Sequence, residues 1–303
     1  MIVVSGATGT IGSEVVRLLV ARGLPVRALS RDRSRARQAL GPGVEIRQAD
    51  LEQPETLSAV LDGAAAVLVL TAVSDALAAQ ERNLVDAATR AGTPHLVKLS
   101  AIGAAPDSPM TLGRQHGLSE EHLREQDISW TVLRPTSFMQ NLLMHVPSIR
   151  SDGRIFAPYG EGRVAFVDTR DIAATAAEIL AEPEPHSGEI YTLTGPEPVS
   201  HQRVAEAIGA AAGREVSYVP VPPEAAREAM LKVGLPGWLA DEHGNPIMEE
   251  TDVPETYHLL PAGGTREMGG HKGYGLSVMV DILAGVLSGT GPGFLNKGTA
   301  SHH

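Results

Sequence analysis

The first chemically informative residues are three glycines in the opening sequence IVVSGATGTIGSEVVRLL. Gly6, Gly9 and Gly12 lie between a β-branched run and a helical pattern, and each occupies a position where a side chain would interfere. Gly6 permits a tight turn, Gly9 lets a pyrophosphate approach the backbone, and Gly12 lets the helix pack against the strand. Unpaired amides at the start of the helix attract an anion. The spacing therefore predicts a dinucleotide-binding turn.

The residues after the second predicted strand indicate which dinucleotide binds. NAD sites usually carry an acidic residue here to hold the ribose 2′-hydroxyl, but this strand ends at Arg31, and Arg33, Arg35 and Arg37 follow. A guanidinium pairs well with a 2′-phosphate. NADP(H) is therefore the predicted cofactor and NAD(H) the less favoured one, with Arg31 as the phosphate ligand and with Arg35 and Arg37 as solvated residues of a helix start. The predicted cofactor-binding residues are Gly6, Thr8, Gly9, Thr10, Ile11, Gly12, Arg31, Asp50, Leu51, Thr71, Ser100 and Pro135.

Further candidates stand where the later strands end. Asp50 and Leu51 close the third strand and would flank the adenine, although Asp50 could equally cap the next segment. Ser100 follows the fifth strand and could hydrogen-bond a substrate oxygen or cap the next turn. Pro135 ends the sixth strand and would shape the nicotinamide wall. Three following residues are predicted to line the acceptor pocket, although the first two could equally be core: Phe138, Met139 and Asn141.

The hydrophobic pattern supplies the scaffold that positions these residues. Residues 1 to 100 alternate five β-branched runs with helical patterns, which predicts an α/β fold with a doubly wound parallel Rossmann sheet. Gly23, Gly63 and Gly92 stand where helix ends favour a left-handed residue. A helix at about 113 to 126, the strand WTVLR and the helix RDIAATAAEILAE extend the sheet. From EIYTL onward, mainly over residues 185 to 240, we expect a small α/β annex over the carboxyl edge, where ligands bind.

Composition limits the possible function classes. The chain has 303 residues, 43% of them hydrophobic, which is enough for a substantial core. It has neither a long uncharged apolar run nor a signal-peptide pattern, so we expect a cytoplasmic protein without a membrane partner. Without cysteine it can form no disulfide or thiolate metal site, and no metal site is predicted. The net charge of -11 argues against a nucleic-acid partner. A small-molecule substrate is expected, and a homodimer is left open.

Several segments, in this order, resemble the NmrA-like branch of the atypical short-chain dehydrogenase/reductase superfamily. They are the glycine turn, Asp50 with Leu51, KLSA, LGRQHGLSEEHLREQDISWTVLRPTSFMQNLL, FVDTRDIA and YTLTGPEPVS. The resemblance covers about residues 1 to 240. It implies a Rossmann domain with a small annex and NAD(P)H as ligand. Members include quinone reductases and dye reductases, and also redox-sensing regulators that bind the cofactor without turnover.

The chain departs from the ordinary superfamily pattern on the helix after the fifth strand. There most members use Tyr-x-x-x-Lys to exchange a proton with the substrate, whereas this helix reads QHGLSEE. Glu120 follows His116 by four residues and so shares its helix face. A histidine oriented by a carboxylate could donate a proton near neutral pH. His116, Glu120 and Ser100 are therefore the predicted catalytic residues, with His116 as a surface or cofactor-packing residue equally open.

The sequence changes character near residue 240 and becomes acidic and then glycine-rich. About 55 residues from Asp241, including HLLPAGGTREMGGHKGYGLSVMVDILAGVLSG, resemble the malate/L-lactate dehydrogenase family. That resemblance implies NAD(H) near Lys272 and the neighbouring glycines, but the chain lacks the part that holds the family's catalytic histidine. We interpret residues 241 to 298 as a borrowed segment in a chimaeric chain, and residues 299 to 303 as a terminal tail or the remnant of a tag. The implied NAD(H) neighbours are Gly270, Lys272, Gly273 and Gly275.

The predicted function is an NAD(P)H-dependent reductase that transfers hydride to a small conjugated, carbonyl, imine or quinone acceptor. Such a transfer requires little beyond holding two partners face to face, so the missing tyrosine does not exclude it. Two alternatives stay open. One is a non-enzymatic NADP(H)-binding redox sensor, which the missing Tyr-x-x-x-Lys favours. The other is a 2-hydroxy acid dehydrogenase, which the C-terminal segment alone suggests.

Overall fold

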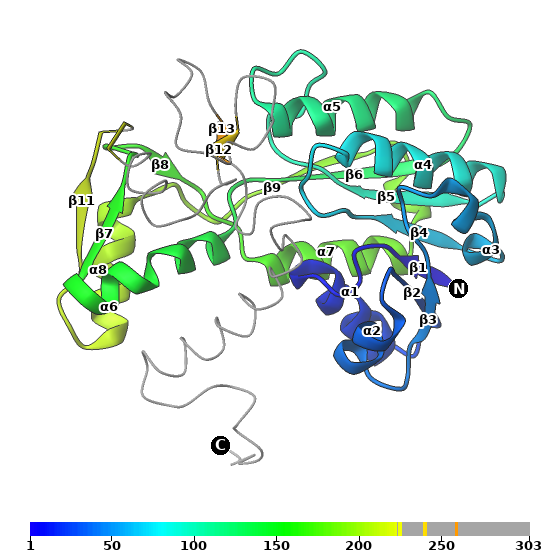
Figure 1. The fold of residues 1–303 in the computed structure, drawn as a ribbon, viewed down its shortest axis with the longest axis horizontal. Helices are drawn as coiled ribbons and strands as arrows, with labels where there is room; N and C mark the ends of the chain where they lie inside the picture. Colours follow the sequence, from blue (N-terminus) through cyan, green and yellow to red (C-terminus); the bar gives the residue numbers. More distant parts are fainter. Residues whose placement is uncertain (223, 226–238, 241–257, 260–303) are drawn as a thin grey trace.

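A single seven-stranded sheet forms the centre of the computed structural model, which describes residues 1–222, 224–225, 239–240 and 258–259 (Figure 1). All neighbouring strands in it run parallel. The fold class predicted from the sequence is therefore confirmed. The order of strands is β3 (Glu45–Gln48), β2 (Val26–Ser30), β1 (Ile2–Val4), β4 (Ala66–Val69), β5 (His95–Leu99), β6 (Ser129–Pro135) and β9 (Ile190–Leu193).

Helices cover both faces of the sheet (Figure 1). One face carries α1 (Thr10–Ala21) and α7 (Thr169–Ala181), which lie side by side, with α2 (Arg33–Leu40) at its edge. The other carries α3 (Ser58–Leu61), α4 (Leu77–Arg90) and α5 (Thr111–Arg124). Two short 3₁₀ turns, η1 (Pro54–Thr56) and η3 (Glu184–His186), complete the connections of this domain.

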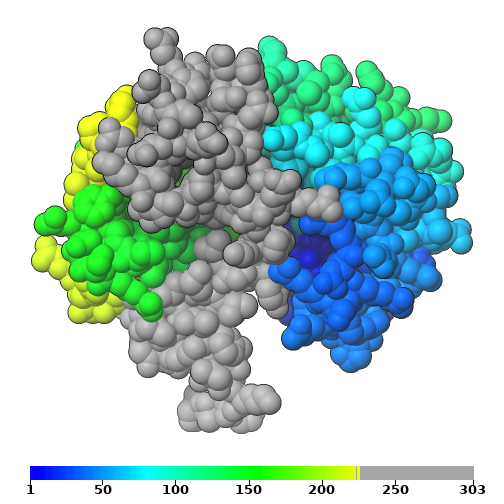
Figure 2. Space-filling view, viewed as in Figure 1, coloured from blue at the N-terminus to red at the C-terminus, as the bar shows by residue number. Residues whose placement is uncertain are grey.

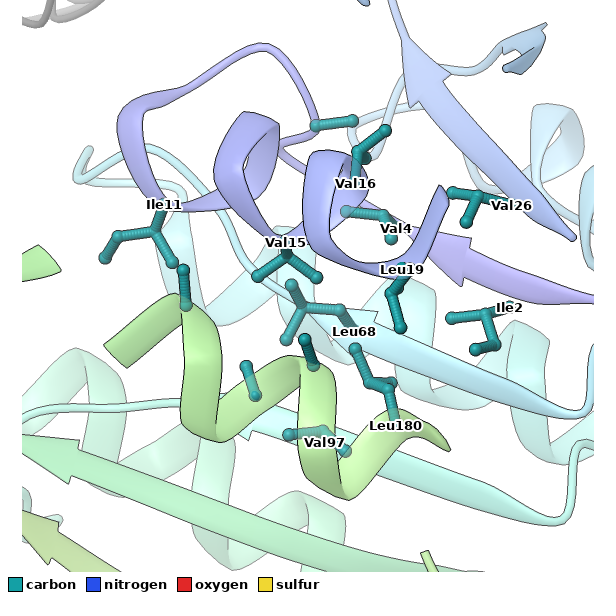
Figure 3. Packing of buried hydrophobic residues seen from close by; sticks show 14 of the residues in the cluster. Ile2, Val4, Ile11, Val15, Val16, Leu19, Val26, Leu68, Val97 and Leu180 are labelled. Atoms are coloured by element: carbon teal, nitrogen blue, oxygen red, sulfur yellow. The ribbon is translucent and has the colours of Figure 1, made fainter. Parts of the chain in front are cut away.

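Figure 3 shows the core between the sheet and the α1/α7 layer. Val15 and Leu19 of α1 are fully buried against Leu68 and Val97 of the strands. Helix α7 presents a run of alanines on its buried face, including Ala173 and Ala177, and small side chains allow two helices to approach closely. A second apolar cluster fills the opposite face beneath α3 and α4. Burial on both faces explains why the strand sequences are continuously apolar rather than alternating.

The annex forms a second small body beside the carboxyl edge of the sheet; Figure 2 views both parts from the same side. Its strands pair as β7 with β11 in parallel and β8 with β10 antiparallel. Its own core contains Ile149, Ile155, Phe166, Val204 and Val216. The elements are η2 (Met139–His145), α6 (Val146–Asp152), β7 (Arg154–Ala157), β8 (Arg163–Val164), β10 (Val199–Ser200), α8 (His201–Ala212) and β11 (Ser217–Pro220).

The structure changes the expected composition of the annex. Sequence reasoning places EIYTL in the annex, whereas Ile190–Leu193 pairs with β6 and becomes the edge strand of the main sheet. Conversely, the annex already begins in η2, well before residue 185. The predicted glycine helix ends are confirmed, since Gly23, Gly63 and Gly92 all have positive φ.

Little of the C-terminal segment belongs to the described residues. Two short strands, β12 (Leu239–Ala240) and β13 (His258–Leu259), pair with each other antiparallel. The rest of the segment predicted as a chimaeric tail, including Lys272 and its glycines, lies outside the described residues. In the part of the chain that is described, no helix is both long and apolar enough to cross a membrane.

Candidate active site

The three glycines of the first turn differ in what restricts them. Gly6 has φ +60°, and a Cβ added there would lie 2.8 Å from the carbonyl oxygen of Leu70. A Cβ on Gly12 would lie only 2.2 Å from the carbonyl oxygen of Gly6, which is far inside contact distance. A Cβ on Gly9 would meet only that same oxygen, at 3.3 Å. The fold itself therefore requires Gly6 and Gly12, whereas Gly9 leaves open space beside the turn.

This turn sits where the strand order reverses, between β1 and β4. Ligands of open α/β sheets bind at such a point. The hydroxyl of Ser5 connects the two strands, because its oxygen lies 2.8 Å from the Leu68 carbonyl and accepts the Leu70 N–H at 2.9 Å. Sequence reasoning missed Ser5. Helix α1 begins after Gly9 without any side-chain cap, so its first amides are available to an anion.

The predicted cofactor residues of the turn lie together, although not all can offer side chains. Thr8 and Thr10 are half-buried at the surface of the turn. Ile11 belongs to the apolar core, so only its backbone can contact a nucleotide. A cavity of about 220 Å³ opens beside Thr8, and its other lining residues all come from α2: Arg35, Gln38 and Ala39.

This cavity changes the ranking of the arginines. Arg31 is exposed at the end of β2, and its contact with a 2′-phosphate stays a prediction. Asp32 begins α2 by accepting the backbone N–H of Arg35 at 2.9 Å. Arg35, in the first turn of this helix, lines the cavity with Thr8. Arg35 is exposed, in agreement with the solvated residue predicted from the sequence, and it also lines the cavity beside the cofactor turn.

Three further predicted cofactor residues have structural partners. The carboxylate of Asp50 accepts the Glu52 N–H at 3.1 Å in the turn after β3, and Gln53, not Asp50, is the N-cap residue of η1. Leu51 packs on the second apolar cluster, and its carbonyl accepts the side-chain amide of Asn83 at 2.7 Å. Thr71, just beyond β4, donates its hydroxyl to Glu81 at 3.0 Å. Their contacts with adenine or ribose stay predictions.

Glu120 lies at the centre of a buried network between α5, β5 and β6. Its Oε1 accepts the Ser100 hydroxyl at 2.6 Å and Arg134 Nε at 2.9 Å, while Oε2 accepts Nη2 of Arg134 and of Arg124, each at 2.5 Å. Burial raises the pKa of Glu120, but the hydrogen bonds from Arg134 and Ser100 and the arginine charges outweigh it and leave that pKa lowered. Glu120 is thus ionised and fully engaged, and the hydrogen of Ser100 is committed to it.

His116 has a different partner from the one that the sequence suggests. Its Nδ1 lies 3.3 Å from Nζ of Lys98, whereas Glu120 bonds Ser100 and the two arginines. Glu120 therefore does not orient His116, and the predicted pairing is wrong. Spacing along a helix brings two residues to one face, but it does not decide which strand residues they meet. Burial and then the positive charge of Lys98 lower the pKa of His116 well below 6.5.

The network around Lys98 is fully buried. Its ammonium group pairs with Glu81 of α4, and neither side chain is exposed. Glu81 also accepts the hydroxyls of Ser119 at 2.5 Å and Thr71 at 3.0 Å. Sequence reasoning assigned no role to Glu81 or Ser119. One signal was available, because Lys98 interrupts the apolar strand sequence LVKL, and a charge on a doubly buried strand needs a partner.

The loop after β5 packs closely against one face of α5. Gly113 and Gly117 are four residues apart and face the loop after β5. A Cβ on Gly117 would lie 2.1 Å from the Ala105 carbonyl carbon, and one on Gly113 would lie 2.4 Å from Oγ of Ser108. The loop therefore leaves no room for a side chain at either glycine on this helix face.

The residues after β6 lead from the sheet to the annex. Pro135 is buried at the end of β6, and its carbonyl accepts the Ile102 N–H at 3.0 Å. Phe138 packs on the main core and bridges to Val167. Met139 is 44% exposed and Asn141 is also exposed. Phe138 therefore follows its predicted core alternative, while Met139 and Asn141 are available to a ligand.

Asp168 begins α7 and fixes this connection. Its carboxylate accepts the Arg170 backbone N–H at 2.8 Å and the Gln140 amide at 3.0 Å. The side-chain hydrogen bond from Arg170 is the main cause that lowers the pKa of Asp168 to about 2. Asp168 is therefore the N-cap residue of α7.

A cavity of about 250 Å³ lies elsewhere, between the start of α7 and the end of β9, and is lined by Val167, Asp171, Thr175, Thr192, Leu193 and Thr194. It contains none of the predicted site residues. The predicted residues instead gather in two places along the carboxyl edge of the sheet: the glycine turn with α2, and the α5 network with the loop after β6.

Comparisons with known proteins agree with this architecture. The chain is 45% identical over 241 residues to an NAD(P)H azoreductase of Xenophilus azovorans, spanning 80% of this chain and 84% of the relative. Its fold matches the crystal structure of the NADPH-dependent quinone oxidoreductase QOR2 of Escherichia coli complexed with NADPH, with a TM-score of 0.72 and 29% identity over 78% of this chain and 84% of that one. It also matches Citrobacter sp. triphenylmethane reductase complexed with NADP(H), with a TM-score of 0.70 and 28% identity over 77% and 83% of the two chains.

Two family models match successive parts of the chain. Residues 231–302 match Malate/L-lactate dehydrogenase, which confirms the resemblance of the C-terminal segment. Residues 1–237 match the NmrA-like family, and these contain the whole sheet, the glycine turn and the α5 network. The chain belongs to the NmrA-like family.

Proposed function

We propose that this chain is an NADPH-dependent reductase that transfers hydride to a small conjugated acceptor of the quinone or dye class. The observation that carries the proposal is the glycine turn at the point where the strand order reverses, with open space beside Gly9 and uncapped amides at the start of α1. Relatives named as azoreductase, quinone oxidoreductase and triphenylmethane reductase support the acceptor class. Carbonyl and imine acceptors belong to the same proposal as less favoured substrates.

The residues present fit a dinucleotide. The turn from Gly6 to Gly12 would hold the pyrophosphate through backbone amides, and Thr8 would add a hydroxyl beside it. Arg35 lines the neighbouring cavity, so its guanidinium would pair with the 2′-phosphate that distinguishes NADPH from NADH. When bound, the cofactor supplies the hydride. The protein's contribution is to hold the acceptor against its reactive end and to exclude water.

The acceptor would lie beyond β6, where Met139 and Asn141 are exposed beside the annex. Ser100 cannot readily donate to a substrate oxygen, because its hydroxyl hydrogen is directed to Glu120. Glu120 is itself saturated with donors and ionised, so it is a poor proton donor. A site of this kind suits acceptors whose electron-poor π-system takes hydride without strong acid assistance, with the balancing proton coming from water.

The direct test is NADPH consumption with a panel containing a quinone, an azo dye, a triphenylmethane dye, a cyclic imine and a simple ketone. We expect turnover with one or more of the first three and little with the ketone. Gly9→Val is the matched control, because it blocks the nucleotide position without a severe clash in the fold. Tight NADPH binding with no turnover on any acceptor would overturn the reductase and favour the redox sensor.

Other expectations from the sequence stand as proposals of lower rank. A homodimer, the absence of a nucleic-acid partner and a cytoplasmic location rest on sequence reasoning alone. The 2-hydroxy acid dehydrogenase alternative depends on residues outside the described part of the chain. Adding malate or lactate with NAD⁺ to the same assay tests that alternative directly.

A further inference from the structure

The contact between Lys98 and His116 determines which nitrogen of the imidazole carries its proton. An ammonium group has three donors and no acceptor. Because Nζ of Lys98 lies 3.3 Å from Nδ1 of His116, that nitrogen must offer its lone pair. A neutral ring then carries its single hydrogen on Nε2. The tautomer is thus fixed by a neighbour on β5.

Lys98 is held in place by a buried ion pair. It is paired with Glu81 in a pocket where both side chains are fully buried, and an ion pair of this kind is costly to break by removing one charge. Ser119 and Thr71 donate to the same carboxylate from α5 and from the end of β4. The donors therefore converge on Glu81, and Lys98 is left with Nδ1 of His116 and a longer contact to the Leu99 carbonyl at 3.4 Å.

The other side of the ring is available. Within the described residues, the hydrogen-bond contact of the His116 side chain is the one with Lys98. Three side-chain atoms there are both fully buried and without a hydrogen-bond partner: Ser74 Oγ, Thr93 Oγ1 and His201 Nδ1. Nε2 of His116 is not one of them, so this nitrogen is not completely enclosed. His116 is 7% exposed, and it lies one helical turn before Glu120. Since α5 runs opposite to the parallel strands, that turn is nearer the carboxyl edge, where ligands bind.

We propose that Lys98, held by Glu81, is a positioning residue that presents His116 as a neutral Nε2–H donor to the electronegative atom of the hydride acceptor. This inference rests on the proposed function and names the donor at that site. The N–H would stabilise negative charge that develops on an acceptor oxygen or nitrogen as hydride arrives. His116 keeps its proton throughout, and water supplies the proton that completes reduction. The role is that of a neutral electrophile, unlike the proton donor predicted from the sequence.

The charged groups around the ring support this assignment. Lys98 from β5 and Glu81 from α4 lie on the Nδ1 side, and Glu120 of α5 is occupied by Arg134 of β6 and by Arg124. A second proton on the ring would therefore be placed beside an ammonium group without a free carboxylate to balance it. The geometry favours one neutral tautomer over a wide pH range.

The first experiment measures the tautomer directly by ¹⁵N–¹H correlation NMR of the full chain without substrate. The His116 signal among the eleven histidines is assigned by its loss in His116→Gln. We expect an Nε2–H pattern that does not titrate between about pH 5.5 and 8. An Nδ1–H pattern, or titration near the ordinary pKa of about 6.5, would overturn the proposal whether or not the enzyme turns over.

The second experiment removes the positioning group. Lys98→Met/Glu81→Gln replaces both charges together, which avoids an unpaired buried ion, and should make the His116 signal titrate or mix tautomers. Arg124→Met is the matched control, because it removes a cation from the neighbouring Glu120 network and should leave the His116 signal unchanged. Equal changes in both variants would mean a general loss of packing and would contradict a specific role for Lys98. If the double variant does not fold, the wild-type spectrum alone decides.

Kinetics with the best acceptor of the panel completes the test. His116→Ala should lower kcat about 100-fold with little change in the KM for NADPH, as for loss of one preorganised donor. His116→Gln keeps an N–H donor and should recover about tenfold of that loss. The double variant should acquire a pH-dependent kcat in the range where the wild type is flat. Unchanged kcat in His116→Ala would refute the donor role while leaving the reductase intact.

Discussion

The glycine turn and the α5 network lie along the same edge of the sheet but are built from different parts of the chain. The turn consists of backbone. Close contacts exclude a side chain at Gly6 and Gly12, whereas Gly9 leaves open space beside the turn. The α5 network consists of side chains from α4, α5, β5 and β6. A site made of backbone amides recognises the pyrophosphate that all dinucleotides share, and a side chain added to one of its glycines disrupts it. A side-chain network can change with each residue, so it is where differences between acceptors are expected to arise.

The largest expected effect separates two glycines of the turn. Gly9→Val should reduce NADPH affinity by on the order of 1000-fold or more, because the branched side chain would fill the space beside the turn that the diphosphate needs. Its melting temperature should change little, since a Cβ on Gly9 contacts only the Gly6 carbonyl at 3.3 Å. Calorimetric titration with NADPH and a thermal melt of the same sample measure both quantities.

Gly12→Ala provides the contrast within that experiment. Its Cβ would lie 2.2 Å from the Gly6 carbonyl oxygen, so we expect it to unfold the turn and lower the melting temperature. A Gly12→Ala protein as stable as wild type would show that the backbone turn can adjust. In that case the distinction between a glycine needed for folding and one needed for binding would fail.

The next effect acts on the side-chain network. Glu120→Ala leaves Arg134, Arg124 and Ser100 without their shared acceptor, and we expect a loss of about 3 kcal/mol in the free energy of unfolding. NADPH affinity should fall far less than in Gly9→Val, because the turn is separate from Glu120. Urea denaturation and calorimetry measure the two losses. A Glu120→Ala protein with normal stability but no nucleotide binding would reverse the comparison between the two regions.

The same contrast explains what the sequence could predict. The glycine turn is local, with its restricting contacts mostly within a few residues, so spacing alone indicates its structure. The network joins Glu81 to Ser119 and Lys98 to His116 across 38 and 18 residues, and no local pattern records such pairings. The sequence indicates that His116 and Glu120 are chemically unusual residues for this helix, and their catalytic role stays a prediction. Their partners could not be predicted because these depend on the register between α5 and β5.

Strand β9 shows a similar limit for the fold. Its sequence predicts a strand, which is confirmed, but a short apolar strand does not encode its neighbour. Whether Ile190–Leu193 joins the main sheet or the annex depends on the path of the chain after α7. Arg35 is comparable, because the sequence predicts a helix start here but does not show that Arg35 lines a cavity with Thr8, 27 residues earlier in the chain. Element type was therefore more predictable than element position.

A moderate effect tests which arginine beside the glycine turn makes binding selective for NADPH. Arg35→Ala should weaken NADPH binding by about tenfold to 100-fold and NADH binding much less, because only NADPH carries the 2′-phosphate. Arg31→Ala is the matched variant at the end of β2, and we expect it to have the smaller effect. Affinities for both cofactors are measured by titration at one fixed salt concentration. Equal loss of NADH and NADPH in Arg35→Ala would contradict the phosphate role.

The smallest effect uses acid to distinguish the backbone turn from the side-chain network. Residues 5 to 12 contain no titratable side chain. Burial raises the pKa of Glu120, but the hydrogen bonds from Arg134 and Ser100 and the arginine charges have the larger effect, so that this pKa is lowered from its ordinary value of 4.5. A carboxylate with a depressed folded pKa stabilises the fold fully above its unfolded pKa, and that stability is lost as pH falls through the folded value. Glu120→Gln cannot lose it. The difference in unfolding free energy between wild type and Glu120→Gln should therefore shrink as pH falls below 4.5.

The protonation of His145 also changes stability in a neighbouring pH range, and its contribution must be separated from that of Glu120. Burial and the nearby His201 lower the pKa of His145 to about 4. Between pH 6.5 and 4 the unfolded chain therefore binds a proton that the folded chain excludes, and the stability of the fold decreases as the pH is lowered through that interval. His145 lies in the annex and changes wild type and Glu120→Gln alike, so its contribution cancels in the difference. Denaturation of both proteins at a series of pH values measures the difference in their unfolding free energies. A difference that stays constant below pH 4.5 would mean that the arginines do not favour the ionised form of Glu120.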